Sequence, residues 1–88
     1  MKYEELKEYL IERGFDDADI FAPPTDCAPA AIGVSEDGRV VYDYEKMVKW
    51  FVKGGMSLED VDEFIEINTL RGLPSMGEKR PIIMYKLD

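Results

Sequence analysis

The pair Asp37-Gly38 lies between two apolar runs, and this arrangement restricts the possible folds more than any other feature of the chain. The runs are residues 30–34, Ala-Ala-Ile-Gly-Val, and residues 39–42, Arg-Val-Val-Tyr. Asp-Gly between apolar segments is the strongest short-range signal for a β-hairpin, because glycine readily takes the positive φ that a tight turn needs. The sequence therefore predicts two antiparallel strands connected by residues 35–38.

Two segments, one on each side of this hairpin, have apolar residues at the three- and four-residue spacing of an amphipathic helix. The first is expected to end at Gly14, and the second to begin at Asp43, whose carboxylate can cap the helix N-terminus. Gly54-Gly55 is then expected to end the second helix. The two apolar stripes are Tyr3, Leu6 and Leu10, and Tyr44, Met47, Val48, Phe51 and Val52.

A third helix is predicted after Ser57, which forms a capping box with Asp60, and it is expected to end at Gly72 and Pro74. Asn68 continues its apolar stripe, so the amide is expected to face the core or the end of the sheet and to need hydrogen-bond partners there. Holding the backbone of the following turn is favoured over contacting a ligand, since short polar side chains often serve turns. The rest of the stripe is Leu58, Val61, Phe64 and Ile65.

Residues 81–85 form a short apolar run whose first residue is proline, which a strand tolerates at that position. Residues 15–29 contain three prolines and no sustained period, so they are expected to form an extended loop. A chain of 88 residues with 45% hydrophobic residues is expected to fold as one domain, residues 1–88. The prediction is an α+β fold in the order α-β-β-α-α-β, with a three-stranded antiparallel sheet covered on one face by helices and an undetermined strand order.

The chain is strongly acidic, with 19 Asp and Glu residues against 11 Lys and Arg and a net charge of −8. Nucleic acids and anionic membranes are therefore not expected as direct ligands, because they attract basic surfaces. The chain shows no apolar run long enough for a membrane span and no signal-peptide pattern, so a cytoplasmic location is expected. With Cys27 as the single cysteine, an internal disulfide is not possible.

Most catalytic chemistries have weak support in these residues, and no enzyme activity, metal or cofactor is predicted. The chain contains no histidine, and Asp26 next to Cys27 is expected to raise the thiol pKa, so a buried structural cysteine is favoured over a nucleophile. Asp16, Asp17 and Asp19 lie close in sequence to Asp26, but they lack the spacing of a calcium-binding loop, which favours a solvated acidic turn.

Three groups of polar and aromatic residues are candidate contact surfaces. Lys46, Lys49 and Lys53 share one face of the second helix, as a strip for an acidic partner, as partners of neighbouring acidic helices, or simply as residues that keep the chain soluble. A pocket or turn hypothesis groups Asn68 and Arg71 with three tyrosines, which either share an exposed interface or fill the core edge. These tyrosines are Tyr42, Tyr44 and Tyr85. The acidic candidates are Glu4, Glu5, Glu8 and Glu12, and Glu59, Asp60, Asp62, Glu63 and Glu66.

Three blocks of the chain resemble a family of small, functionally unassigned proteins of bacteriophages, prophages and related mobile elements. The blocks are residues 37–47 (DGRVVYDYEKM), 68–74 (NTLRGLP) and 81–85 (PIIMY). The chain departs from the family pattern at Gly72, where alanine is usual, and at Ser75, where an aromatic residue is usual. The resemblance implies a small accessory product that acts inside an infected bacterium.

The leading functional hypothesis is a small acidic protein-binding module that inhibits a host defence or nucleic-acid-handling protein, as anti-CRISPR proteins do. Surfaces rich in Asp and Glu can compete for Lys and Arg grooves, which fits this hypothesis. The alternative is a small-ligand-binding protein, completed by a homodimer, or a self-assembling phage component. The sequence leaves the choice between a monomer and a homodimer open.

Overall fold

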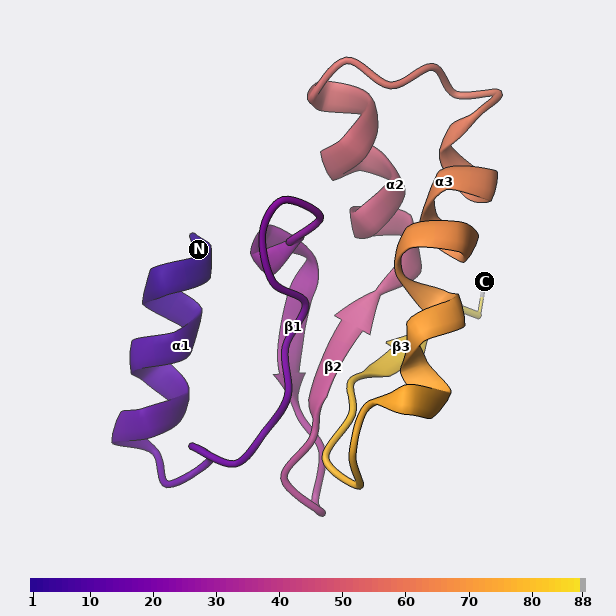
Figure 1. The fold of residues 1–88 in the computed structure, drawn as a ribbon. Helices are drawn as coiled ribbons and strands as arrows, with labels where there is room; N and C mark the ends of the chain where they lie inside the picture. Colours follow the sequence, from indigo (N-terminus) through magenta and orange to yellow (C-terminus); the bar gives the residue numbers. More distant parts are fainter. Residues whose placement is uncertain (88) are drawn as a thin grey trace.

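The computed structural model describes residues 1–87, which form three α-helices, three strands and two short 3-10 helices, η1 and η2 (Figure 1). The two 3-10 helices are additions to the predicted order of elements. In chain order the elements are α1 (Tyr3–Glu12), η1 (Ala28–Ala30), β1 (Ala31–Val34), β2 (Val40–Asp43), α2 (Tyr44–Lys53), α3 (Val61–Asn68), η2 (Leu70–Ser75) and β3 (Ile82–Met84).

The sheet has the order β1-β2-β3 and is mixed, which corrects the predicted antiparallel arrangement. The predicted hairpin is confirmed, because β1 and β2 pair antiparallel and Gly38 takes a φ of 81° in the turn between them. β3 pairs parallel to β2, with Val41 opposite Ile82. The long connection through α2, α3 and η2 brings the chain back in the same direction, as a parallel pair requires.

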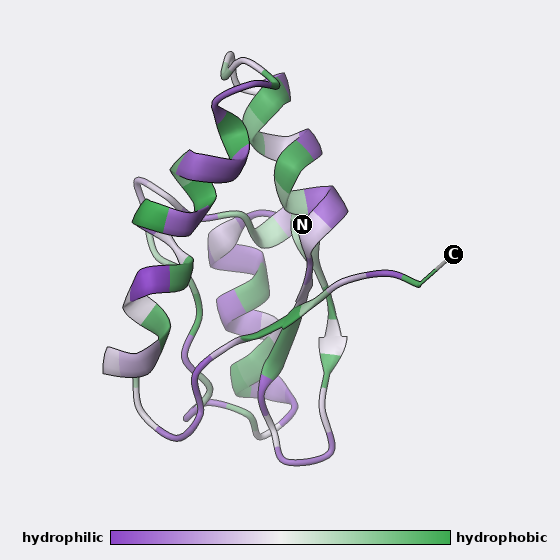
Figure 2. Ribbon diagram, turned by 90° about the vertical axis from the view of Figure 1, so that its right-hand side faces the viewer, coloured by the Kyte–Doolittle hydropathy of each residue, from purple (hydrophilic) through white to green (hydrophobic). Residues whose placement is uncertain are grey.

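The helices lie on one face of the sheet, so the fold has two layers. In Figure 2 the helices are on the left and the strands on the right, with no helix beyond the strands. Val40 and Tyr42 point from β2 into the covered face, where Ile83 of β3 joins them. Val41 and Ile82 point to the opposite face and are only partly buried. The predicted coverage of a single face is therefore observed.

The hydrophobic core fills the space between the sheet and the helices. Each helix contributes residues from its predicted apolar stripe, such as Leu6 and Leu10 from α1 and Ile65 from α3. The long loop before β1 contributes as well, since Cys27 is fully buried and the Tyr42 hydroxyl accepts a hydrogen bond from the Phe21 N–H at 3.3 Å. The loop is thus part of the core rather than a surface connection.

The two predicted helix boundaries at Gly14 and Asp43 are confirmed. Gly14 follows the C-cap of α1 with a φ of 83°, a backbone conformation that glycine favours. Asp43 is buried at the start of α2, and its Oδ1 accepts hydrogen bonds from the backbone N–H groups of Glu45 (2.9 Å) and Lys46 (3.3 Å). This cap fixes the junction between β2 and α2.

We expect Asp43→Ala to destabilise the protein by about 1–2 kcal/mol, because both N–H groups lose their acceptor. Urea denaturation measures the change. Asp43→Asn is the matched control, since its amide oxygen can still accept these hydrogen bonds, and we expect it to lose less stability. Equal losses in the two variants would contradict the capping role.

The third helix is shorter than predicted. It begins at Val61, because residues 58–60 form a turn in which the Ser57 hydroxyl and the Asp60 carboxylate lie 2.9 Å apart. It ends at Asn68, and the residues from Leu70 onward continue as the 3-10 helix η2. Pro74 lies inside η2 rather than beyond the end of the α-helix, which corrects the predicted boundary.

Within residues 1–87, the structure has no helix with the length and apolar character of a membrane span.

Candidate functional site

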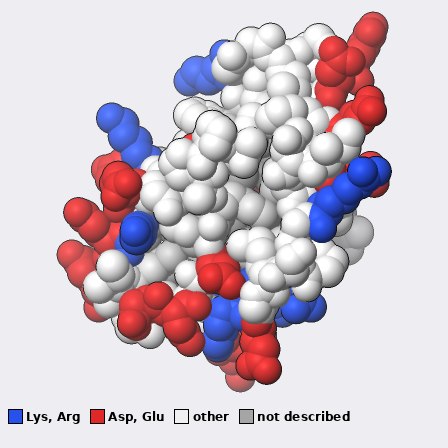
Figure 3. Space-filling model, viewed as in Figure 1, with Lys and Arg blue, Asp and Glu red and all other residues white. Residues whose placement is uncertain are grey.

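The nine acidic residues predicted to bind a partner all have solvent-exposed side chains. They form two groups, which Figure 3 shows along the left edge of the molecule, at α1, and at the upper right, next to α3. Within residues 1–87 none of the nine takes part in an ion pair; the ion pair found there joins Arg39 to Asp37 at 3.7 Å. Within residues 1–87, no Lys or Arg side chain therefore neutralises one of these carboxylates by forming an ion pair with it.

Three of the nine carboxylates accept hydrogen bonds from their own neighbourhood. Glu5 accepts from the backbone N–H of Lys2 at 2.8 Å, which helps to cap α1. Asp60 accepts from the Ser57 hydroxyl, and Asp62 from the Tyr44 hydroxyl at 2.6 Å. The other six belong to the exposed faces of α1 and of the α3 region and make no side-chain hydrogen bond within residues 1–87.

The lysine strip of α2 is also exposed, at Lys46, Lys49 and Lys53. One interpretation paired these lysines with the acidic faces of neighbouring helices. No ion pair joins any of them to a carboxylate within residues 1–87, so this interpretation is not supported. The strip as a contact surface for an acidic partner stays a prediction.

Three of the five residues of the predicted pocket do come together. Tyr44, Arg71 and Tyr85 line an open hollow of about 600 Å³, beside Asp62. The rings of Tyr44 and Tyr85 have centroids 5.0 Å apart and a tilt of 31°. Burial of the Tyr44 hydroxyl and its hydrogen bond to Asp62 raise the pKa of Tyr44 above its ordinary value. The hollow thus combines aromatic faces with charges of both signs.

Tyr42 and Asn68 do not join this hollow, which corrects the predicted grouping. Tyr42 is fully buried, and burial raises the pKa of its hydroxyl above the ordinary value. Asn68 is exposed, and its Nδ2 donates to the Phe64 carbonyl of the same helix at 3.0 Å instead of holding the following turn. The buried polar residue at this helix end is Thr69, whose hydroxyl oxygen has no hydrogen-bond partner within residues 1–87.

Cys27 is fully buried, and burial together with the neighbouring Asp26 charge raises the pKa of the thiol from 9.0 to about 12. A thiol with such a pKa carries almost no thiolate at neutral pH, so it is a poor nucleophile. The structure therefore agrees with the predicted structural role of Cys27.

We expect the native protein to react with a thiol reagent at least about a hundredfold more slowly than the urea-unfolded chain, because reaction needs opening of the core.

The Cys27 thiol ionises at a higher pH in the folded chain than in the unfolded chain. Its contribution to stability is therefore complete below pH 9.0 and is lost as the pH rises from 9.0 towards about 12. Urea denaturation against pH, compared with Cys27→Ala, measures this contribution; an identical pH dependence of the two proteins would contradict it.

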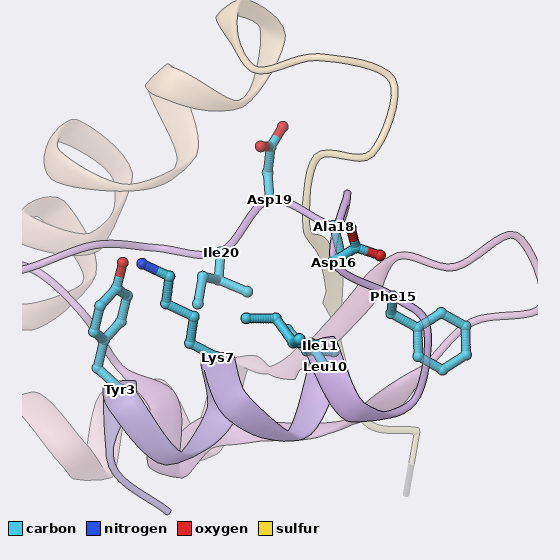
Figure 4. Close-up of a pocket in the computed structure, with 9 residues that line it drawn as sticks. All are labelled: Tyr3, Lys7, Leu10, Ile11, Phe15, Asp16, Ala18, Asp19 and Ile20. Carbon is cyan, nitrogen blue, oxygen red and sulfur yellow. The ribbon is translucent and has the colours of Figure 1, made fainter.

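A small hollow of about 240 Å³ lies between α1 and the segment after it (Figure 4). Leu10, Ile11 and Ile20 line it, and the charged side chains in its lining include Lys7 and Asp19. The hollow is mainly a gap in the packing of this segment on α1. Within residues 1–87, no three Asp, Glu, Cys or His side chains are placed to hold a metal ion.

The residue that sequence analysis did not single out is Trp50. It is 37% exposed on α2, and its indole Nε1 donates to the Asp26 carbonyl at 3.1 Å. The ring lines two separate hollows, one next to the N-terminus of α1 and one next to the end of α2. The sequence did contain a signal for an exposed aromatic residue. Trp50 lies on the same helix face as Lys46 and Lys53, where an apolar side chain is unexpected.

Comparisons of the chain with protein-family models, with curated proteins and with solved structures gave no match. The resemblance to small proteins of phages and mobile elements therefore stays a prediction.

Proposed function

We propose that this chain is a small acidic protein-binding module that binds a basic surface of a host protein. The observation that carries the proposal is the set of nine exposed carboxylates on α1 and around α3, none of which takes part in an ion pair within residues 1–87. A partner with Lys and Arg side chains would supply the missing counter-charges. The class of partner is therefore a protein with a basic groove or patch.

Basic grooves on proteins commonly serve nucleic acids, because phosphate backbones bind Lys and Arg. An acidic protein that occupies such a groove excludes the nucleic acid by competition. We therefore propose an inhibitor of a host defence or nucleic-acid-handling protein, as anti-CRISPR proteins are. The resemblance of residues 37–47, 68–74 and 81–85 to phage and mobile-element proteins supports this setting in the cytoplasm of a bacterial cell.

The arrangement of the charges also supports protein binding. Figure 3 shows uncharged surface between the acidic groups at α1 and at α3. Protein interfaces commonly have an apolar centre inside a polar rim, and charge pairs at the rim speed association and select the partner. Such pairs are screened by salt, so the complex is expected to weaken as the ionic strength rises.

The experiment that tests the proposal is capture of binding proteins from bacterial lysate on the tagged chain, at low and at high salt, with mass spectrometry of the eluates. We expect a nucleic-acid-binding protein to be retained at low salt and released at high salt. Heparin, a polyanion, should also release it at constant ionic strength, because heparin competes for the same basic surface. An empty low-salt eluate, or retention that heparin does not affect, would contradict the proposal.

The alternative of small-ligand binding has one observation in its favour, the open hollow lined by Tyr44, Arg71 and Tyr85. We rank it second, because Tyr85 is 60% exposed and the Tyr44 hydroxyl already donates to Asp62. Ligand sites usually bury most of the ligand surface, which an open hollow on one small chain does not do. A homodimer that covers Tyr85 would favour this alternative, and sedimentation of the purified chain measures the oligomeric state.

A further inference from the structure

The indole ring of Trp50 is held in place at the surface of α2. Its single polar atom, Nε1, donates to the Asp26 carbonyl at 3.1 Å, which ties the ring to the loop before η1. The rest of the ring keeps 37% of the residue exposed. A tryptophan fixed in this way presents apolar surface without losing side-chain entropy on binding, which is the property of an interface anchor.

Two separate hollows have this ring in their lining. One, of about 470 Å³, is lined mainly by apolar surface of Tyr3, Pro23 and Pro29. The other, of about 450 Å³, is lined by Pro24, Phe51 and Met56, with Lys53 as the base among its lining residues. Trp50 and Asp26 line both, so the indole forms a ridge between two apolar depressions.

The charges around the first hollow are mostly negative. Glu4 and Glu5 of α1 line it together with Asp26, whereas Lys2 is the one base among its lining residues. Asp26 and Glu4 form no ion pair within residues 1–87. A segment that enters this hollow therefore meets an apolar floor with a negative rim, which is complementary to apolar side chains flanked by Lys or Arg.

We propose that the surface formed by Trp50 and its two hollows is the anchoring site for a protein segment that carries two apolar side chains flanked by basic residues. One apolar side chain enters each hollow, on either side of the Trp50 ridge, and a basic side chain pairs with Glu4 or Glu5. This inference rests on the proposed binding of a basic partner and adds where and through which chemistry the partner binds.

Other occupants fit the site less well. A second copy of the chain would bring another net charge of −8, so the two copies would repel each other. An anionic lipid surface would be repelled by the same acidic rim. A basic protein segment complements both the apolar floor and the negative rim of the first hollow, whereas neither of these two occupants complements the rim.

The test uses the fact that Trp50 is the only tryptophan of the chain, so intrinsic fluorescence reports on this site directly. The probe is a synthetic arginine-rich peptide with two leucines placed on one helical face, and the comparison is the same peptide with serines in place of the leucines. We expect the leucine peptide to shift the Trp50 emission to shorter wavelength and to bind at least about tenfold more tightly than the serine peptide.

Two single variants separate anchoring from charge attraction. Pro29→Glu places a carboxylate in the first hollow, and Ile67→Glu places one on the exposed surface of α3, so both add one negative charge. Charge attraction alone predicts slightly tighter peptide binding by both variants. Anchoring predicts that Pro29→Glu loses about tenfold or more in affinity for the leucine peptide, while Ile67→Glu does not.

The outcomes distinguish failure of the anchoring site from failure of the proposed function. If both peptides bind equally and the Trp50 emission stays unchanged, the anchoring site is wrong, although the chain still binds basic partners. If neither peptide binds at low salt, the binding of basic partners is itself wrong. Leucine-dependent binding that Pro29→Glu weakens supports the anchoring site.

Discussion

Tyr42→Ala is expected to remove a large part of the free energy that stabilises the folded chain. Tyr42 is fully buried at the centre of the sheet, and its ring centroid lies 4.8 Å from that of Phe21. Truncation of a buried aromatic residue costs about 3–5 kcal/mol, a large part of the roughly 5–10 kcal/mol by which a domain of this size is stable. Urea denaturation followed by circular dichroism measures the loss.

Tyr42→Phe is the matched control, because it keeps the ring and removes the hydroxyl that accepts from the Phe21 N–H. We expect a loss of about 1–2 kcal/mol, since one buried donor is left without its partner. Partner binding by this variant should equal that of the parent chain, because Tyr42 lies in the core. If Tyr42→Phe instead lost partner binding while its stability stayed unchanged, Tyr42 would have to be part of the contact surface.

Local signals predicted the parts of the fold that depend on a few neighbouring residues. The turn at Asp37-Gly38 and the cap at Asp43 are examples, because each requires one residue type at one position. The exposure of the acidic residues followed from the apolar stripes, since a helix that buries Leu6 and Leu10 must turn Glu4 and Glu8 to solvent.

Features that depend on distant contacts were not predictable from the sequence. The direction of β3 follows from the path of residues 44–81 across the covered face, and no residue of the strand itself encodes it. The end of the third helix was misplaced because the residues from Leu70 onward continue as the 3-10 helix η2. The polar residue buried at this helix end is Thr69 rather than Asn68.

Tyr42 and Tyr44 show how the end of a strand changes the direction in which a side chain points. Tyr42 and Tyr44 are two apart, so strand alternation would put them on the same face. β2 ends at Asp43, however, and Tyr44 is the first residue of α2, so the two side chains separate into the core and the hollow with Tyr85. The position of Trp50 on the polar face of α2 could be seen in the sequence, but its hydrogen bond to the Asp26 carbonyl could not, because the loop at Asp26 has no regular pattern.

The second large effect is expected from reversing charges on α1. The double variant Glu4→Lys with Glu8→Lys should lower the affinity for a basic partner by about tenfold or more, because attraction at two rim positions becomes repulsion. Each exchange replaces a charge of −1 with one of +1, so the net charge changes from −8 to −4. The effect should shrink at high salt, because exposed charges are screened.

The matched control is Glu36→Lys with Glu78→Lys, which changes the net charge by the same amount. Both residues are exposed near the hairpin turn, where the Lys79 amine contacts the Asp37 carbonyl, and neither lines the two hollows beside Trp50. We expect this control to lose less than about threefold in affinity, since only the long-range field of the protein changes.

Binding through the acidic face of α1 is tested by the amount of partner that each of these two double variants retains from bacterial lysate at low salt, relative to the parent chain. We expect the α1 variant to lose the partner and the control variant to keep it. Equal retention by the two variants, whether high or low, would contradict binding through the acidic face of α1.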